Sequence, residues 1–255
     1  MKRMMHAESL SGTKASLLCL LLLLTMSTKA FSQIADKRTY LSDVLVEMHK
    51  QWPNNRTQNL VFHGHSVPTG YYTSRIGVRT FDSYPFYTLK SLKDRYPYCV
   101  LNCIVTSIGG ENSQAGSRRF TKTVLNHRPD VLFIDYSLND RRLSLEEARS
   151  NWSRMIRKAL ARGIKVILLT PTPDLKEDIR DPETLLARHA QMVRSLAETY
   201  HVGLVDSYSI FRQMALDGVD LKHYMSQNNH PNEKGHRVVA DAILEWFLDA
   251  DNYEK

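Results

Sequence analysis

Residues 131–140 read VLFIDYSLND, and this stretch decides the fold. Its first four residues, Val131 to Ile134, form a continuous apolar run without the alternation of a strand that has one face in water. Such a run is typical of a strand buried on both faces, as in a parallel sheet covered by helices. Polar residues follow at once, from Asp135 to Asp140, so side chains suited to chemistry begin where the strand is predicted to end.

Strands and helices alternate on both sides of this stretch. Patterns of apolar residues predict further strands at 59–62, 98–108, 164–169 and 203–206, and helices at 40–51, 85–95, 113–126, 143–162, 182–201, 207–216 and 231–248. Helices of this length between strands favour parallel βαβ units. The predicted fold class is therefore α/β, a three-layer α/β/α sandwich with about five parallel strands.

The segments that follow the predicted strands carry residues suited to acyl transfer. Ser66 follows the first strand, Gly110 follows the second, and Asn139 follows the third, while His230 stands just before the last helix. The carboxyl ends of parallel strands lie at one edge of a sheet, where ligands bind. A serine attacks a carbonyl while a histidine takes its proton. Backbone amides, among them that of a glycine, and a side-chain amide can hold the developing oxyanion.

These residues resemble the conserved blocks of the SGNH hydrolase superfamily, the GDSL-type esterases and lipases. Gly64-His65-Ser66 is similar to the first block, Gly110 to the second, Asn139-Asp140 to the third, and His230-Pro231 to the fifth. The resemblance implies a flavodoxin-like fold, ester hydrolysis without a metal or cofactor, Ser66 as nucleophile and His230 as general base. It further implies an oxyanion hole made by the amides of Ser66 and Gly110 and the side chain of Asn139.

The chain departs from that family pattern at three positions. His65 replaces the usual aspartate of the first block, and we interpret it as a residue that packs the loop. Ser137 replaces a glycine of the third block. Gln227 stands where the family has the aspartate that orients the histidine, and a glutamine cannot supply a negative charge to an imidazolium. A backbone carbonyl or Asn228 is then left to orient His230, or an acid such as Asp220 or Asp217 substitutes, or the enzyme is slow or inactive.

Composition argues against several other classes of protein. The net charge is +7, and residues 1–32 hold four basic residues and one acidic residue, which leaves +4 for residues 33–255. Basic residues are scattered, so no nucleic-acid partner is predicted. Cys99 and Cys103 would lie about 13 Å apart along one strand, too far for a disulfide. His63 and His65 lack an evident third ligand, so no metal site is predicted.

The first 32 residues have the pattern of a secretory signal peptide. Lys2, Arg3 and Lys14 precede the apolar run 17–24, and Ala30-Phe31-Ser32 resembles a cleavage site. The run is too short for a membrane-spanning helix, which needs roughly 20 residues. We therefore expect a leader at 1–32, a single domain at 33–255, a secreted or periplasmic location, and no stable membrane insertion after cleavage. The sequence does not indicate an oligomeric state.

The function that these residues favour is hydrolysis of short-acyl esters, acetyl above all, on a small molecule or a carbohydrate. A lipase or thioesterase acting on longer acyl chains is the alternative enzyme, and an acyltransferase would use the same acyl-enzyme. A carbohydrate-binding protein that kept the fold with weak catalysis is the alternative from another class, and Gln227 supports it. Tyr71 and Tyr72 either line a sugar or acyl pocket or cover the helix that follows.

Overall fold

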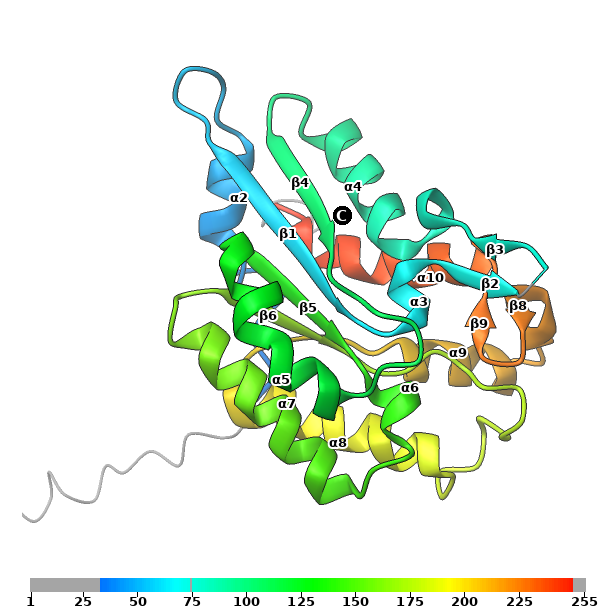
Figure 1. Cartoon of the computed structure of the whole chain (residues 1–255). Coiled ribbons are helices and arrows are strands. Elements are labelled where there is room, and N and C mark those ends of the chain that lie inside the picture. The colour runs from blue at the N-terminus through cyan, green and yellow to red at the C-terminus, as the bar shows by residue number, and fades with distance from the viewer. Residues whose placement is uncertain (1–32, 74, 250–255) are drawn as a thin grey trace, which may run out of the picture. The chain divides into compact units, whose positions relative to one another are not determined.

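Five parallel strands form the central sheet in the order β4-β1-β5-β6-β7 (Figure 1). The computed structural model describes residues 33–73 and 75–249. The predicted three-layer α/β sandwich with five parallel strands is thus confirmed. The strands are β1 (Thr57–Gly64), β4 (Val100–Val105), β5 (Val131–Asp135), β6 (Lys165–Leu169) and β7 (Gly203–Val205).

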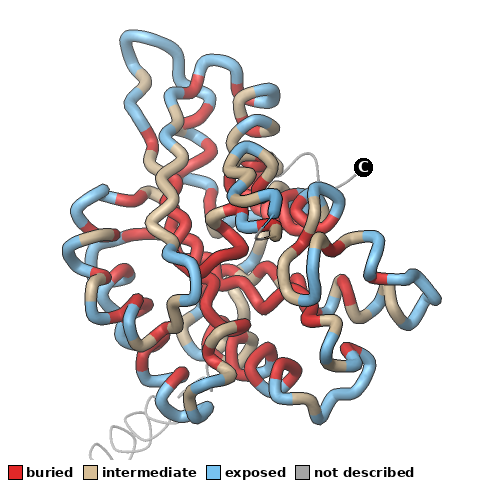
Figure 2. The backbone as a smooth tube through the Cα atoms, turned by 45° about the vertical axis from the view of Figure 1, so that its right-hand side comes forward, coloured by how far each residue is buried: buried red, intermediate tan, exposed pale blue. Residues whose placement is uncertain are grey.

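Helices cover both faces of this sheet, as the apolar run 131–134 predicts. Val131 and Phe133 of β5 pack into one apolar cluster, and Leu132 and Ile134 pack into another on the opposite face. Figure 2 shows the buried segments of the chain gathered at the centre of the tube. One face is covered by α2 (Ser42–Met48), α4 (Tyr84–Arg95), α9 (Ser207–Leu216) and α10 (Glu233–Leu244), and the other by α5 (Ser113–Thr123), α7 (Leu145–Leu160) and most of α8 (Leu185–Tyr200).

Side-chain caps fix where several helices begin. The Ser144 hydroxyl accepts a hydrogen bond from the Glu147 amide, and the Glu147 carboxylate bonds back to the Ser144 amide, which forms a capping box at the start of α7. Asn112 caps α5 and Asn232 caps α10 in the same way, by accepting amide hydrogen bonds. These two caps stand close in sequence to Gly110 and His230, so they also fix the loops that carry those residues.

Two small hairpins and two single-turn helices were not foreseen from the sequence pattern. The hairpins pair β2 (Tyr71–Thr73) with β3 (Gly77–Val78) and β8 (Met225–Gln227) with β9 (His230–Pro231), and the two lie in contact (Figure 1). The short helices are α3 (Ser66–Thr69) and α6 (Ser137–Asp140), directly after β1 and β5. The last helix was predicted to start at Pro231 but begins at Glu233, because Pro231 pairs in β9 and Asn232 forms the cap.

The predicted leader, residues 1–32, lies outside the described residues. In the part of the chain that the structure describes, no helix combines the length and the apolar character needed to cross a bilayer.

The packing of α5 on the sheet yields a first prediction, on stability. Gly116 lies in α5 against the buried ring of Tyr136, and a Cβ at this position would overlap the ring. A helical Gly→Ala substitution normally stabilises by up to about 1 kcal/mol. Here we expect Gly116→Ala to lower the free energy of unfolding by about 1–3 kcal/mol, because the overlap forces the core apart. Urea unfolding measures this change.

Arg118→Ala, at an exposed position of the same helix, is the matched control, and we expect little change in its stability. An increase in stability for Gly116→Ala would contradict the packing described for Tyr136.

Candidate active site

Ser66 and His230 meet at the carboxyl end of β1. Ser66 is the first residue of α3, and its side chain is largely buried. His230 lies in β9, and its Nε2 is 2.7 Å from Ser66 Oγ. The structure therefore brings together two residues 164 positions apart, in the geometry by which an imidazole accepts a hydroxyl proton.

Gln227 is the residue that contacts the other ring nitrogen of His230. Gln227 and His230 are paired across the β8–β9 hairpin, and the side-chain amide of Gln227 is in hydrogen-bond contact with His230 Nδ1. If the amide nitrogen donates to Nδ1, the imidazole proton must sit on Nε2, which then cannot accept from Ser66. A half-turn of the amide places Oε1 there instead, so that Nδ1–H donates and Nε2 is free to accept. Only this second arrangement serves a general base.

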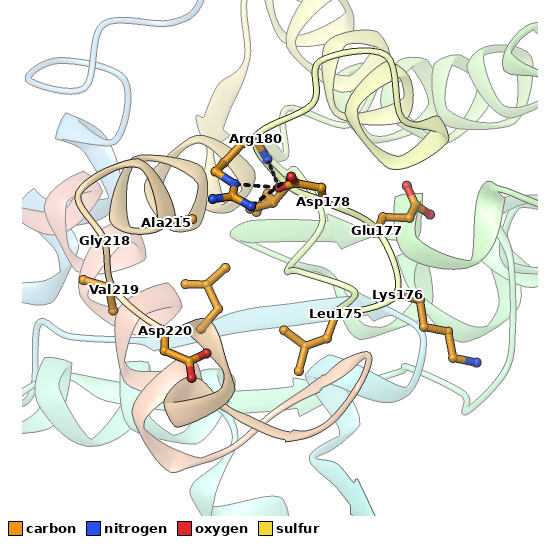
Figure 3. Close-up of a pocket in the computed structure, with 11 residues that line it drawn as sticks. Leu175, Lys176, Glu177, Asp178, Arg180, Ala215, Gly218, Val219 and Asp220 are labelled. Atoms are coloured by element: carbon orange, nitrogen blue, oxygen red, sulfur yellow. Dashed lines mark hydrogen bonds and ion pairs between the residues drawn. The ribbon is translucent and has the colours of Figure 1, made fainter.

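The other residues considered for orienting His230 make different contacts. The backbone carbonyl of Asn228 accepts a hydrogen bond from the Leu175 amide. The carboxylate of Asp220 accepts from the Lys222 amide at the start of a short 3₁₀ helix. Figure 3 shows Asp220 at a cavity of about 470 Å³ formed with the segment that follows β6, where Asp178 pairs with Arg180. Asp217 accepts a hydrogen bond from the Gln213 side chain.

His230 is held in its neutral form over most of the pH range. Its pKa is lowered to about 4, mainly by burial and to a smaller extent by the neighbouring His65, while Asp174 acts in the opposite direction. No carboxylate is hydrogen-bonded to Nδ1 among the contacts of the described residues. His230 is consequently ready to accept a proton at neutral pH, but its protonated form receives less stabilisation than in a Ser-His-Asp arrangement.

The segment after β4 lies beside the Ser66 loop and carries Gly110. The Ile108 amide donates to the Gly64 carbonyl at 3.1 Å, which aligns this segment with the end of β1. Gly110 has φ +77°, a left-handed conformation that glycine adopts without strain. Because Gly110 has no side chain, no Cβ stands beside its backbone amide, which the family resemblance implies is an oxyanion donor.

Glu111 ties the Gly110 segment to Asn139. Asn139 Nδ2 donates to the Glu111 carbonyl at 2.9 Å, which leaves its second amide hydrogen for a ligand. The Glu111 carboxylate pairs with Arg119 and accepts a 2.7 Å hydrogen bond from the Tyr136 hydroxyl. Asn139 is thus bonded to the backbone of the residue that follows Gly110, and the side chain of that residue is itself held by Arg119 and Tyr136.

His65 fastens the Ser66 loop to the neighbouring strand. Its Nδ1 accepts a hydrogen bond from the Val67 amide at 3.2 Å, and its Nε2 lies 3.3 Å from Asp135 Oδ1. The other oxygen of Asp135, Oδ2, accepts a hydrogen bond from the Tyr84 hydroxyl at 3.0 Å. All of these side chains are buried. His65 therefore packs the loop and pairs with a carboxylate of β5. Ser137, the third departure, is fully buried in α6.

Sequence reasoning did not single out Asp135, Tyr84, Glu111 or Asp174. A carboxylate directly after a strand buried on both faces was the available signal for Asp135, because such a charge needs a partner. Asp174 lies in the segment after β6 and pairs with Arg141 at 2.7 Å. In residues 33–73 and 75–249, no group of three or more histidine, cysteine, aspartate or glutamate side chains is arranged to hold a metal ion.

Solved structures with the same architecture include several esterases. Axe2, an acetylxylan esterase from Geobacillus stearothermophilus, superposes with a TM-score of 0.65 at 19% identity, covering 76% of this chain and 95% of its own. A two-domain esterase (CEX) active on acetylated mannans gives 0.67 at 20%, covering 86% of this chain and 56% of its own. The acetyl xylan esterase AlAXEase gives 0.62 at 21%, covering 74% of this chain and 100% of its own.

The family model for the GDSL-like lipase/acylhydrolase family matches residues 62–238, which include Ser66, Gly110, Asn139 and His230. No curated protein sequence is significantly similar to this chain. The family match spans more than half of the chain and agrees with the fold. The chain therefore belongs to the GDSL-like lipase/acylhydrolase family, and is a carboxylic ester hydrolase of the SGNH superfamily.

Proposed function

We propose that this protein is an exported serine esterase that removes short acyl groups, chiefly acetyl, from carbohydrates. The observation that carries the proposal is the 2.7 Å contact between Ser66 Oγ and His230 Nε2 at the carboxyl edge of the sheet. The structural neighbours that act on acetylated xylan and acetylated mannan support the substrate class.

In the first half of the proposed reaction, His230 Nε2 takes the proton of Ser66 Oγ as this oxygen attacks the ester carbonyl. The negative charge that develops on the carbonyl oxygen is held by the Ser66 and Gly110 amides and by the second amide hydrogen of Asn139. His230 then gives its proton to the leaving alcohol oxygen, and the acyl group stays on Ser66.

In the second half, a water molecule replaces the alcohol. His230 takes a proton from this water, the resulting hydroxyl attacks the acyl-enzyme, and the acid leaves as Ser66 recovers its proton. With the Gln227 amide turned so that Oε1 faces Nδ1, this oxygen accepts the Nδ1–H hydrogen bond and keeps the imidazole in the required tautomer. Because this oxygen is uncharged, the imidazolium is stabilised less than by a carboxylate.

The surroundings of Asn139 support a short acyl group. A cavity of about 300 Å³ beside it is lined by Leu138, Asn139, Arg141, Arg142, Glu177, Leu185 and Asn229. Charged and amide groups make up most of this lining, and a long acyl chain would displace water from them. A lipase or thioesterase would instead need an apolar trough. The pattern of residues 1–32 supports export through a cleaved leader, with residues 33–255 as the mature domain.

A second candidate function, carbohydrate binding with weak catalysis, is favoured by Gln227 alone. Tight geometry between Ser66 and His230 argues against it, because a site without turnover has no need of this contact. Hydrolysis and acyl transfer share the same acyl-enzyme, and they differ only in whether water or an alcohol reaches it.

Removal of the nucleophile is the first test of this proposal. We expect Ser66→Ala to lower kcat/KM for 4-nitrophenyl acetate by roughly 10⁴-fold or more, because the acyl-enzyme cannot form. The measurement is release of 4-nitrophenol by the purified, folded protein. If the folded wild type shows no turnover above that of the variant, the esterase proposal is overturned and carbohydrate binding becomes the favoured function.

The length of the acyl group is the second test. We expect kcat/KM to fall from the acetyl to the butyryl to the octanoyl 4-nitrophenyl ester, by roughly ten-fold or more across the series, because polar groups line the cavity beside Asn139. A preference for the octanoyl ester would overturn the short-acyl proposal and favour the lipase or thioesterase alternative.

The pH dependence tests the role of Gln227. His230 must be neutral to act as a base, so its pKa of about 4 predicts that kcat/KM is retained in mild acid and falls only as the pH approaches 4. Gln227→Asp places a carboxylate at Nδ1 and favours the imidazolium, so we expect the acid limb to move up by about 1–3 pH units. The measurement is kcat/KM for 4-nitrophenyl acetate between roughly pH 3.5 and 8, a range that includes the expected acid limbs of the wild type and of the variant.

Asn228→Asp is the matched control, because it adds the same charge one residue away, at a side chain without a hydrogen bond to His230 among the described contacts. We expect a smaller displacement of the limb. Identical profiles for wild type and Gln227→Asp would mean that Gln227 does not contact the working histidine.

A further inference from the structure

We infer that the exposed ring of Tyr71 is the platform on which the sugar ring of the substrate stacks, on the leaving-group side of the site. The inference rests on the proposed function, and it assigns to a single side chain the recognition of the alcohol half of the ester.

The ring of Tyr71 lies directly beside the reacting residues. Its centroid is 6.4 Å from that of the His230 imidazole, with an angle of 39° between the planes. The ring also packs on Gly109, where an added Cβ would be 3.0 Å from Tyr71 Cζ. The ring therefore spans from the histidine to the segment that carries Gly110, and the missing side chain of Gly109 makes room for it.

Tyr71 remains exposed although it lies in a paired strand. Its exposed fraction is 41%, and Val78, its partner across the β2–β3 hairpin, is 45% exposed on the same face. Ile108, just before Gly109, is 50% exposed. Tyr71, its strand partner and the residue before Gly109 thus all keep apolar surface exposed to solvent.

The hairpin does not need Tyr71 to hold it in place. Tyr72 points to the opposite face, where it is buried, stacks with His236 and lies under the guanidinium of Arg79. The Ser226 hydroxyl also donates a hydrogen bond to the Tyr72 carbonyl at 3.1 Å. Anchoring therefore falls to Tyr72, and the face of Tyr71 is left free for a ligand.

The chemistry of the proposed reaction decides which half of the ester meets this ring. The leaving oxygen must come within hydrogen-bond reach of His230 Nε2, since this atom protonates it. Tyr71 borders the same imidazole, whereas the polar cavity borders Asn139. A pyranose ring offers an apolar C–H face that stacks on a flat aromatic ring while its hydroxyl groups stay in water. The alcohol half of the ester is thus the part that lies on Tyr71.

The test compares two acetate esters that differ in the alcohol. Acetate release is measured for acetylated xylo-oligosaccharide and for ethyl acetate, whose alcohol has no ring to stack. The ratio of interest is kcat/KM for the sugar ester divided by kcat/KM for ethyl acetate. We expect Tyr71→Ala to lower this ratio by about ten-fold, mainly by raising KM for the sugar ester. We expect Tyr71→Phe and Tyr71→Trp to keep the ratio, because the ring face and not the hydroxyl makes the contact.

Tyr98→Ala is the matched control, since Tyr98 is a 61% exposed tyrosine just before β4, away from the site, and its ratio should not change. Equal losses on both esters in a folded Tyr71→Ala protein would overturn the platform while leaving the esterase proposal standing. A loss of the ratio in Tyr71→Phe would also overturn it, because the hydroxyl would then be the recognition element. A wild type that releases acetate from neither ester would overturn the proposed function and this inference with it.

Discussion

The close pairing of β1 with β5 at Gly64 and Asp135 is the constraint on which the site depends. These two residues are partners in the sheet, and a Cβ on Gly64 would overlap the Asp135 carbonyl oxygen. The strands can therefore approach only because residue 64 is a glycine. His65 then lies with its Nε2 3.3 Å from the Asp135 carboxylate, so the turn that presents Ser66 contacts the strand that leads to Asn139. A change in that pairing would move Ser66 and Asn139, the proposed nucleophile and oxyanion donor, relative to each other.

Burial of neutral histidines characterises the electrostatics of this edge. The pKa values of His63 and His236 are lowered to about 3, mainly by burial, and that of His230 to about 4. Each of these rings has a polar neighbour: Thr106 for His63, the Tyr84 amide for His236 and Ser66 for His230. Neutral imidazoles can act both as donors and as acceptors, so these rings connect the loops without adding charge to the site. A neutral Gln227 beside His230 agrees with this pattern.

The sequence predicted the sheet and its helices because each central strand is a run of apolar residues with a helix of ten or more residues after it. The sequence also predicted that one edge of the sheet carries Ser66, Gly110, Asn139 and His230, because the carboxyl ends of parallel strands lie at the same edge. The β2–β3 and β8–β9 hairpins escaped prediction, since strands of two or three residues carry no periodicity. The contact of Gln227 with His230 depends on the register of such a hairpin. Likewise, the bond between Tyr84 and Asp135 joins residues 51 positions apart, and no local pattern encodes it.

The β2–β3 hairpin stands apart from the central sheet, and its strands pair only with each other. The hairpin lies between α3 and α4 in the sequence, and the residues of the proposed acyl transfer lie on other segments. Divergence within this hairpin can therefore alter which alcohol is accepted while the acyl-transfer residues stay as they are. The fold thus separates the residues assigned to the proposed acyl transfer from a hairpin whose sequence can change independently of them.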